Sequence, residues 1–166
     1  MYETATCVDA FIGSVVEALQ EDAALAGIDM LREFPRALKD HPQLRPAVAV
    51  GLKSCEFTDL LGGYLGADAS GGAVYGRRAR LTLALDIYTP LSMDGETCHS
   101  VFSKLADAAF RADLGGTLRA VQCSGIAYSR ARRALILPAE LQLDVMFRAP
   151  SAVDPAAYSA GEVAVC

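Results

Sequence analysis

The sequence predicts an α+β domain with two layers: a mainly antiparallel sheet of four to five strands, two helices packed on one face, and a long β-hairpin arm. Two segments carry apolar residues at helical spacing, and five carry strand patterns. Four of these strands follow one another in pairs, with no helix between the members of a pair. Such neighbours pair antiparallel, and amphipathic helices bury their apolar stripes on the resulting sheet.

Length and composition predict one globular domain. Of the 166 residues, 52% are hydrophobic and 21% are charged, which is typical of a folded chain. We expect the domain to span residues 1–150 and residues 151–166 to form a loosely ordered tail. The net charge of −5 gives no basic footprint for nucleic acid. Apolar stretches are too short for a membrane span, and the N-terminus lacks a basic leader, so we expect a cytoplasmic chain.

The first helix is predicted from an apolar stripe near the N-terminus. Thr4 or Thr6 would cap it, and it covers about the first 20 residues. An extension to Ala26, where Gly27 would end the helix, is left open. Residues 28–34 then alternate weakly, as in an edge strand. The stripe consists of Val8, Phe11, Ile12, Val15 and Leu19.

Two strong strand patterns follow, separated by a glycine-rich gap. Residues 47–57 are small or apolar on both faces, which predicts a central strand with a helix against its small-residue face. Residues 81–88 alternate strictly, with four large aliphatic side chains pointing inward. The gap at residues 61–75 is long for a compact domain, so we interpret it as a hairpin arm. The small face consists of Ala47, Ala49 and Gly51, and the inward face of Leu81, Leu83, Leu85 and Ile87.

A second helix and a second strand pair complete the domain. Ser92 or Asp94 caps the helix. Residues 119–129 read as a strand with Gly125 as a bulge, and residues 130–133 form a tight basic turn. The last strand alternates strongly, and its inward residues are Leu137, Ala139, Leu141, Leu143, Val145 and Phe147.

No motif predicts catalytic, cofactor-binding or metal-binding residues, and we expect no cofactor. The five cysteines are scattered without a C-x-x-C pair, and only two histidines are present, which argues against a disulfide framework and a zinc site. Cys98 and His99 are helix neighbours that point in different directions, which predicts a buried Cys and an exposed His. The glycines of the gap lack a phosphate-binding frame.

Three carboxylates leave one alternative open. Asp86, Glu140 and Asp144 occupy outward positions on two strands. If those strands are neighbours, a pair of carboxylates can serve acid–base chemistry or hold a hard cation. A small enzyme or ligand-binding domain would then use Asp86, Asp144 and the glycine-rich loop. The favoured interpretation is that the carboxylates solvate the free face of the sheet or contact a partner subunit.

The arginines are concentrated in two short runs. Arginine suits bidentate pairing with carboxylates, so these runs predict contacts between subunits, with Glu21, Asp22 or Glu56 as acidic counterparts. Solvated turn residues and local phosphate contacts are the alternatives. The candidate interface residues are Arg77, Arg78, Arg80, Arg130, Arg132 and Arg133.

The order of these elements is similar to that of a known family. Residues 45–58 are followed by a long hairpin, residues 79–90, a helix, residues 124–130 and finally residues 141–147. Over about residues 5–148 this order resembles the tail terminator (tail completion) proteins of long-tailed bacteriophages, typified by the lambda terminator.

The resemblance implies a structural viral protein, not an enzyme, which needs no cofactor. Such a protein assembles as a homo-oligomer, a hexameric ring, on the last ring of the tail tube, halts tube growth, and joins the tail to the head or neck. The implied partners are the tail tube protein and a head or neck connector protein, with no membrane and no specific nucleic-acid binding. The implied location is a virion or tail-like particle assembled in the bacterial cytoplasm. A neck, connector or tube-like subunit of the same particle is the alternative.

Overall fold

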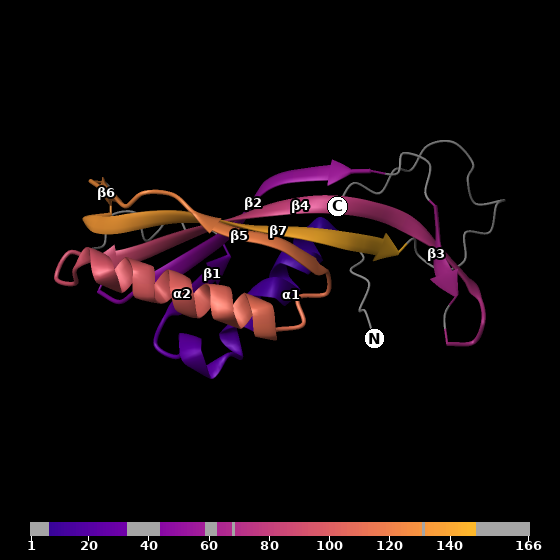
Figure 1. Ribbon diagram of the computed structural model, residues 1–166, viewed down its shortest axis with the longest axis horizontal. Coiled ribbons are helices and arrows are strands. Elements are labelled where there is room, and N and C mark those ends of the chain that lie inside the picture. Colours follow the sequence, from indigo (N-terminus) through magenta and orange to yellow (C-terminus); the bar gives the residue numbers. More distant parts are fainter. Residues whose placement is uncertain (1–6, 33–43, 59–62, 68, 131, 149–166) are drawn as a thin grey trace.

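The structure, a computed structural model, describes residues 7–32, 44–58, 63–67, 69–130 and 132–148. A mixed, mostly antiparallel sheet carries helices on one face, which confirms the predicted α+β class (Figure 1). The elements in chain order are α1 (Val8–Gln20), the 3₁₀ helix η1 (Ala23–Leu25), β1 (Asp29–Arg32), β2 (Ala47–Phe57), β3 (Gly63–Ala67), β4 (Ala73–Pro90), α2 (Gly95–Arg111), β5 (Thr117–Cys123), β6 (Ala127–Ser129) and β7 (Ala134–Arg148).

The main path of the sheet has five strands, in the order β1-β2-β4-β7-β5. Two short strands lie off this path, since β3 pairs with β4 and β6 pairs with β7. The β1–β2 pair is parallel, and the other pairs among the described strands are antiparallel. The two predicted strand pairs are therefore present, and β4 and β7 lie side by side at the centre of the sheet.

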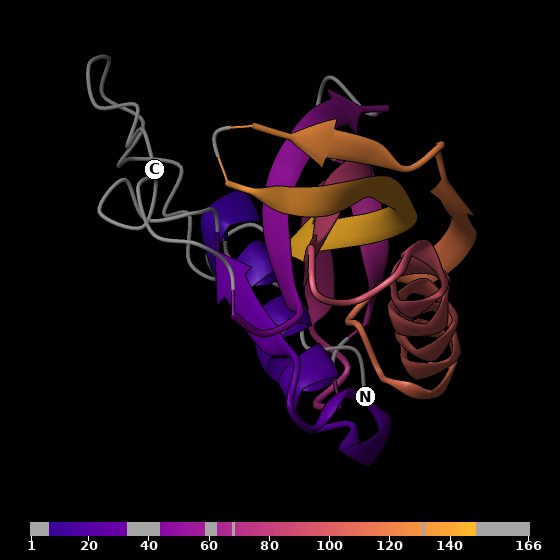
Figure 2. The same cartoon turned by 90° about the vertical axis from the view of Figure 1, so that its left-hand side faces the viewer.

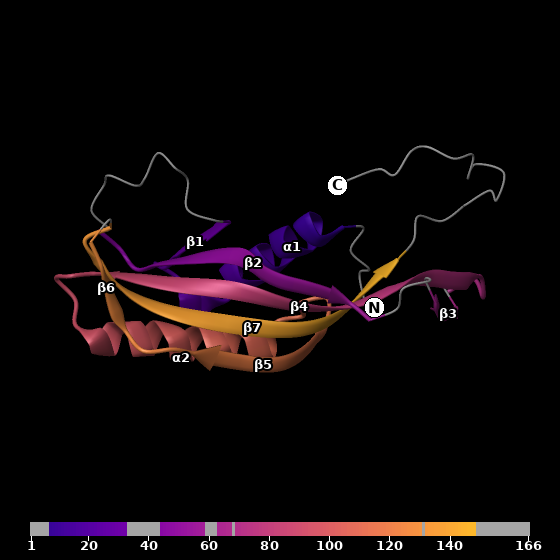
Figure 3. The same cartoon turned by 90° about the horizontal axis from the view of Figure 1, so that it is seen from above.

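Both helices cover the same face of the sheet, as predicted. α1 lies against β1 and β2, and α2 lies against β4, β7 and β5 (Figure 3). A view along the strands shows the two helices side by side below a twisted sheet (Figure 2). The inward residues predicted for β4 and β7 all belong to the hydrophobic core that the helices close.

The predicted orientation of β2 is wrong. Val48 and Val50, rather than the small residues, face the helices and are fully buried. Ala49 packs on the opposite face with Tyr88 and Ala134. The physical reason is that branched side chains fill the space below a helix better than alanine does, while a large neighbour on the open face covers Ala49.

The first helix ends close to the predicted residue 20, and the extension to Ala26 that the sequence left open is absent. It ends at Gln20 rather than near Ala26, because the Asp22 side chain accepts a hydrogen bond from the Ala24 amide (2.9 Å) and caps η1 instead. Gly27, with φ of 84°, completes the turn into β1. At the other end Cys7 is the N-cap, and its Sγ accepts from the Ala10 amide. The predicted caps Thr4 and Thr6 lie outside the described residues.

The second helix begins as predicted. Asp94 is its N-cap, and Asp94 Oδ1 accepts from the Thr97 amide at 3.2 Å. Cys98 is buried, with its Sγ 2.9 Å from Thr89 Oγ1, and His99 is exposed. No helix in the described part of the chain is long and apolar enough to cross a membrane.

The strand predicted at residues 119–129 is two strands. β5 ends at Cys123, where the Ser124 amide donates to the Pro138 carbonyl, and β6 begins at Ala127. The register shift within β5 lies between Leu118 and Ala120 and not at Gly125. The basic turn between β6 and β7 is present, and Arg133 adopts a φ of 48° there. The tail predicted at residues 151–166 lies outside the described residues.

Candidate assembly surface

A hairpin arm projects beyond the core of the sheet. β3 pairs with the first part of β4, from Gly63↔Gly76 to Ala67↔Ala73. β7 ends where the arm begins, because its last residue, Arg148, pairs with Gly76. The arm therefore extends past β7 at one end of the long axis (Figure 1). The predicted arm is confirmed as a two-stranded ribbon.

The arm presents two aromatic side chains to solvent. Tyr64 and Tyr75 are cross-strand partners, with ring centroids 6.0 Å apart in an edge-on arrangement. Their exposed fractions are 59% and 58%. Cross-strand aromatic pairs stabilise a ribbon, and rigid exposed tyrosines are common anchors at protein interfaces. The arm has the chemistry of a protein-binding element.

The glycines of the arm permit backbone conformations and close contacts that other residues would not. Gly66 and Gly71 have φ of 137° and 83°, conformations that L side chains rarely adopt. Gly76 is buried where the arm leaves the sheet, and a Cβ there would lie 2.1 Å from the Phe147 carbonyl oxygen and 2.5 Å from Leu65 Cδ1. These glycines are therefore required by turns and close packing.

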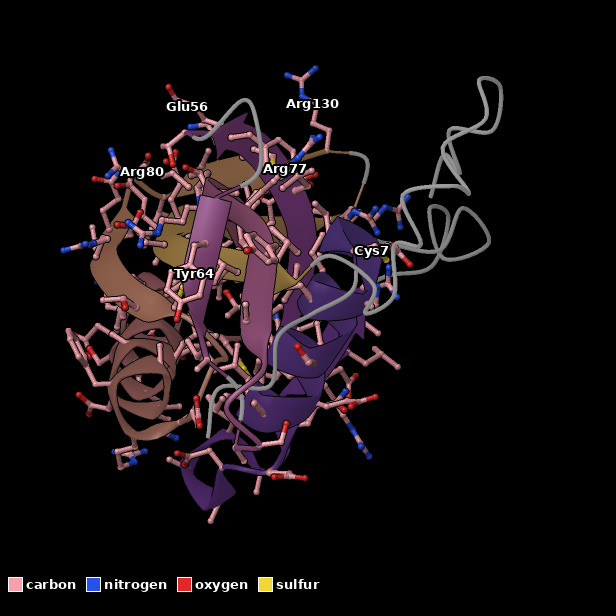
Figure 4. All side chains as sticks on the ribbon, turned by 90° about the vertical axis from the view of Figure 1, so that its right-hand side faces the viewer. Cys7, Glu56, Tyr64, Arg77, Arg80 and Arg130 are labelled. Carbon is pink, nitrogen blue, oxygen red and sulfur yellow. The ribbon has the colours of Figure 1, made fainter. Side chains whose placement is uncertain are left out.

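An aromatic cluster anchors the base of the arm to the first helix. The Phe147 ring lies 6.2 Å from the Phe11 ring and 6.0 Å from the Phe57 ring, centroid to centroid. The Arg77 guanidinium lies 6.0 Å from the Phe57 ring centroid, at the outer limit of a cation–π contact. Figure 4 looks onto this end of the molecule, with Tyr64 and Arg77 labelled.

The six candidate arginines do not form one patch. One run lies at the base of the arm, and the other lies in the β6–β7 turn at the opposite end of the sheet (Figure 1). The 15 residues of β7 separate them. At about 3.3 Å per residue, that is roughly 50 Å. The two runs therefore belong to separate parts of the molecular surface.

The arginines also differ in what they contact. Arg80 Nε donates to Asp144 Oδ1 at 3.0 Å, and Arg119 Nε donates to the other carboxylate oxygen at 2.6 Å. The Arg132 guanidinium lies 5.2 Å from the Tyr88 ring centroid. In contrast, Arg77, Arg78, Arg130 and Arg133 are exposed and make no ion pair with any described residue. These four therefore differ from Arg80, which has a carboxylate partner within the described part of the chain.

The face of the sheet opposite the helices carries a network of ion pairs. Glu140 pairs with Lys53 of β2 and accepts from Gln122 of β5, while Asp144 holds its two arginines. The Lys53 hydrogen bond lowers the pKa of Glu140, with Gln122 adding to the effect. The Arg80 hydrogen bond is the largest cause that lowers the pKa of Asp144. Both carboxylates are thus held in the charged state.

The third carboxylate has a different environment. Asp86 is half-buried, and burial raises its pKa while the charge of Arg132 opposes that shift. Asp86 on β4 lies opposite Pro138 on β7, whereas Glu140 on β7 lies opposite Ala84 on β4. The three carboxylates therefore share one face, but Glu140 and Asp144 are each held by cations. Within the described ranges no group of three or more His, Cys, Asp or Glu residues could hold a metal ion.

Of the predicted acidic counterparts, one is already used within the chain. Asp22 accepts from the Ala24 amide and from Arg111 (2.9 Å), which lowers its pKa. Glu56 lies opposite Arg80 on the neighbouring strand. Glu21 is exposed and makes no ion pair with a residue that the structure describes.

The Asp144 pairs predict an acid-sensitive component of stability. Because the pKa of Asp144 is lowered in the folded state, its contribution is present above its unfolded pKa of about 3.9 and is lost as pH falls through the folded value. We expect Asp144→Asn to reduce the free energy of unfolding at pH 7, with the difference from wild type shrinking below about pH 4. Urea unfolding from pH 3 to 7 measures this. Asp107→Asn, which removes an exposed α2 carboxylate, is the control, and a constant difference for Asp144→Asn would contradict the prediction.

Comparison with known proteins gives two similar solved structures. No protein-family profile and no curated protein sequence matches the chain. A chain of the structure described as the virion of a native gene transfer agent particle is 16% identical, with a TM-score of 0.42, over 90% of this chain and 100% of that one. A chain of the structure described as the sheath/tube terminator of an extracellular contractile injection system, PVC, in its extended state is 15% identical, with a TM-score of 0.48. That match covers 86% of this chain and 58% of the other, so this chain spans little more than half of its neighbour.

Proposed function

We propose that this chain is a tail terminator of a phage or of a phage-derived, tail-like particle. It would assemble as a ring on the end of the tail tube, stop tube growth, and provide the surface that joins the head or neck. The chain would be located in a virion or tail-like particle that is assembled in the bacterial cytoplasm. The partners would be further copies of the chain, the tail tube protein and a connector protein.

The observation that carries the proposal is the projecting arm with its exposed tyrosine pair. A projecting element with rigid aromatic anchors favours binding to another protein. The element order along the sequence, which resembles that of tail terminators, favours the same role. Heterologous contacts between copies close into rings when the rotation per subunit allows.

A structural role accounts for the open face of the sheet better than catalysis does. Glu140 and Asp144 are each held by two side chains, including at least one cation, which keeps them ionised. A general acid would need a raised pKa, and the pKa of each is lowered. Among the three carboxylates only Asp86 has a raised pKa, and neither of the other two is free to act with it, since each is held by a cation.

The test measures the mass of the assembled chain and the length of the tail tubes. Light scattering across a range of protein concentrations should show a ring-sized species. Addition of the purified protein to polymerising tail tube protein should shorten the tubes seen by electron microscopy. A connector subunit would bind the head end and leave tube length unchanged. A chain that stays monomeric at every concentration and has no effect on tube length would refute the proposal.

A further inference from the structure

We infer that the arm of one copy docks on the outer surface of α1 in the next copy, with Arg77 facing Glu17 and Glu21. This inference rests on the proposed self-assembly and names the surfaces that make the contact. We call Tyr64, Tyr75 and Arg77 the arm face, and Glu17 and Glu21 the acidic α1 surface.

The arm face combines apolar anchors with one cation. Tyr75 and Arg77 are two residues apart on β4, so they point to the same side of the ribbon, and Tyr64 is the direct partner of Tyr75. Arg77 contacts the Phe57 ring but makes no ion pair with any residue in the described ranges. A partner for this face should offer a smooth surface with carboxylates at one end.

The outer side of α1 has that chemistry. Its exposed stripe at four- and three-residue steps begins with Ala10 and Ser14, which leave room for aromatic rings, and ends with the two glutamates. Neither Glu17 nor Glu21 makes an ion pair with a described residue, and the last turn of α1 contains no basic side chain.

The placement of these glutamates is unfavourable in an isolated chain. Glu17 and Glu21 are four residues apart, so their like charges repel across one turn. They also lie at the C-terminal end of α1, where the helix dipole favours cations. A guanidinium supplied from outside would relieve both effects, and the neighbouring copy carries on its arm a guanidinium, that of Arg77, with no ion pair to any described residue.

The two surfaces cannot meet within one copy. Phe11, near the start of α1, packs at the base of the arm, and α1 then runs away from the arm toward η1 (Figure 1). The arm itself projects in the opposite direction, beyond the end of β7. The contact must therefore be between copies and head-to-tail, which is the type of interface that closes into a ring.

Charge reversal provides the test, with the oligomer mass measured by light scattering and sedimentation. We expect Arg77→Glu alone, and the Glu17→Arg, Glu21→Arg pair alone, each to weaken self-association at least tenfold. A 1:1 mixture of these two proteins should reassemble. The acidic arm of the first variant fits the basic α1 surface of the second, and the unchanged arm of the second fits the unchanged α1 surface of the first. Alternating subunits would then close rings of even number only.

Lys104→Glu and the Glu96→Arg, Asp107→Arg pair, all on α2, are the matched controls, since they make the same changes of charge at other exposed positions. Thermal unfolding shows whether each variant folds. The α1 variant should melt no lower than wild type, because it exchanges one like-charge pair for another and replaces anions with cations at the helix C-terminus.

The outcomes separate this inference from the proposed function. A wild-type ring that is unaffected by either reversal, or a mixture that fails to reassemble, overturns the inference and leaves the terminator role intact. Loss of binding to tail tube protein with unchanged self-association would assign the arm to the tube and also overturn it. A wild-type chain that is monomeric and has no effect on tubes overturns both.

Discussion

Phe147→Ala is expected to lower the free energy of unfolding by about 3–5 kcal/mol. The Phe147 side chain is 8% exposed and lies between α1 and the base of the arm, in contact with the rings of Phe11 and Phe57. Its removal leaves a cavity where β7 ends, and the sheet on one side and the helix on the other limit collapse into that cavity. Urea unfolding followed by circular dichroism measures the change as a shift in midpoint at constant slope.

The matched control is Phe110→Ala. Phe110 is 73% exposed on α2, so the same truncation there should change the free energy of unfolding by less than about 0.5 kcal/mol. A loss for Phe147→Ala as small as that for Phe110→Ala would mean that Phe147 is not a core residue. The contact that anchors the arm to α1 would then be wrong.

Gly76→Ala is expected to cost about 1–3 kcal/mol or more and to detach the arm from the sheet. The new Cβ would lie 2.1 Å from the Phe147 carbonyl oxygen, which is backbone held by the pairing of β4 with β7. Because a backbone oxygen cannot move away as a side chain can, the strands must separate at this position. Unfolding measurements should show the loss of stability, and hydrogen exchange should show faster exchange of amides in β3 and in residues 73–76 of β4.

Gly63→Ala is the control for this substitution. Gly63 is the cross-strand partner of Gly76, and a Cβ there would meet nothing within 4 Å. The two variants add the same methyl group, one to each member of a cross-strand residue pair. Equal effects would show that the close approach at Gly76 is not what holds the arm in place.

Several elements could be predicted from the sequence because local physics determines them. Strict alternation placed the inward residues of β4 and β7 in the core, since a strand with one buried face must point those side chains one way. Asp94 caps α2 as predicted, because a carboxylate before an apolar stripe satisfies free amides at a helix start. The glycine-rich arm was also predicted from its position between two strands.

Other features could not be predicted, because they depend on what lies opposite in space. The sequence left open whether α1 continues to Ala26, and the Asp22 cap of η1 decided that it does not. The two-sided apolar pattern of β2 was compatible with either orientation, and the packing of Val48 and Val50 below the helices decided it. The distance between the two arginine runs follows from the pairing of β4 with β7, which the sequence does not state.

The sequence by itself determined the α+β class, the strand pairs and the position of the arm, since periodicity and turn residues act over a few positions along the chain. Only the tertiary structure decided which charges have ion-pair partners among the described residues. Arg80 and Arg77 look alike in the sequence, yet Arg80 pairs with Asp144, 64 residues away, while Arg77 has no carboxylate within ion-pair distance among the described residues. The reason is that ion pairing depends on distance in space, and the register of the sheet sets that distance.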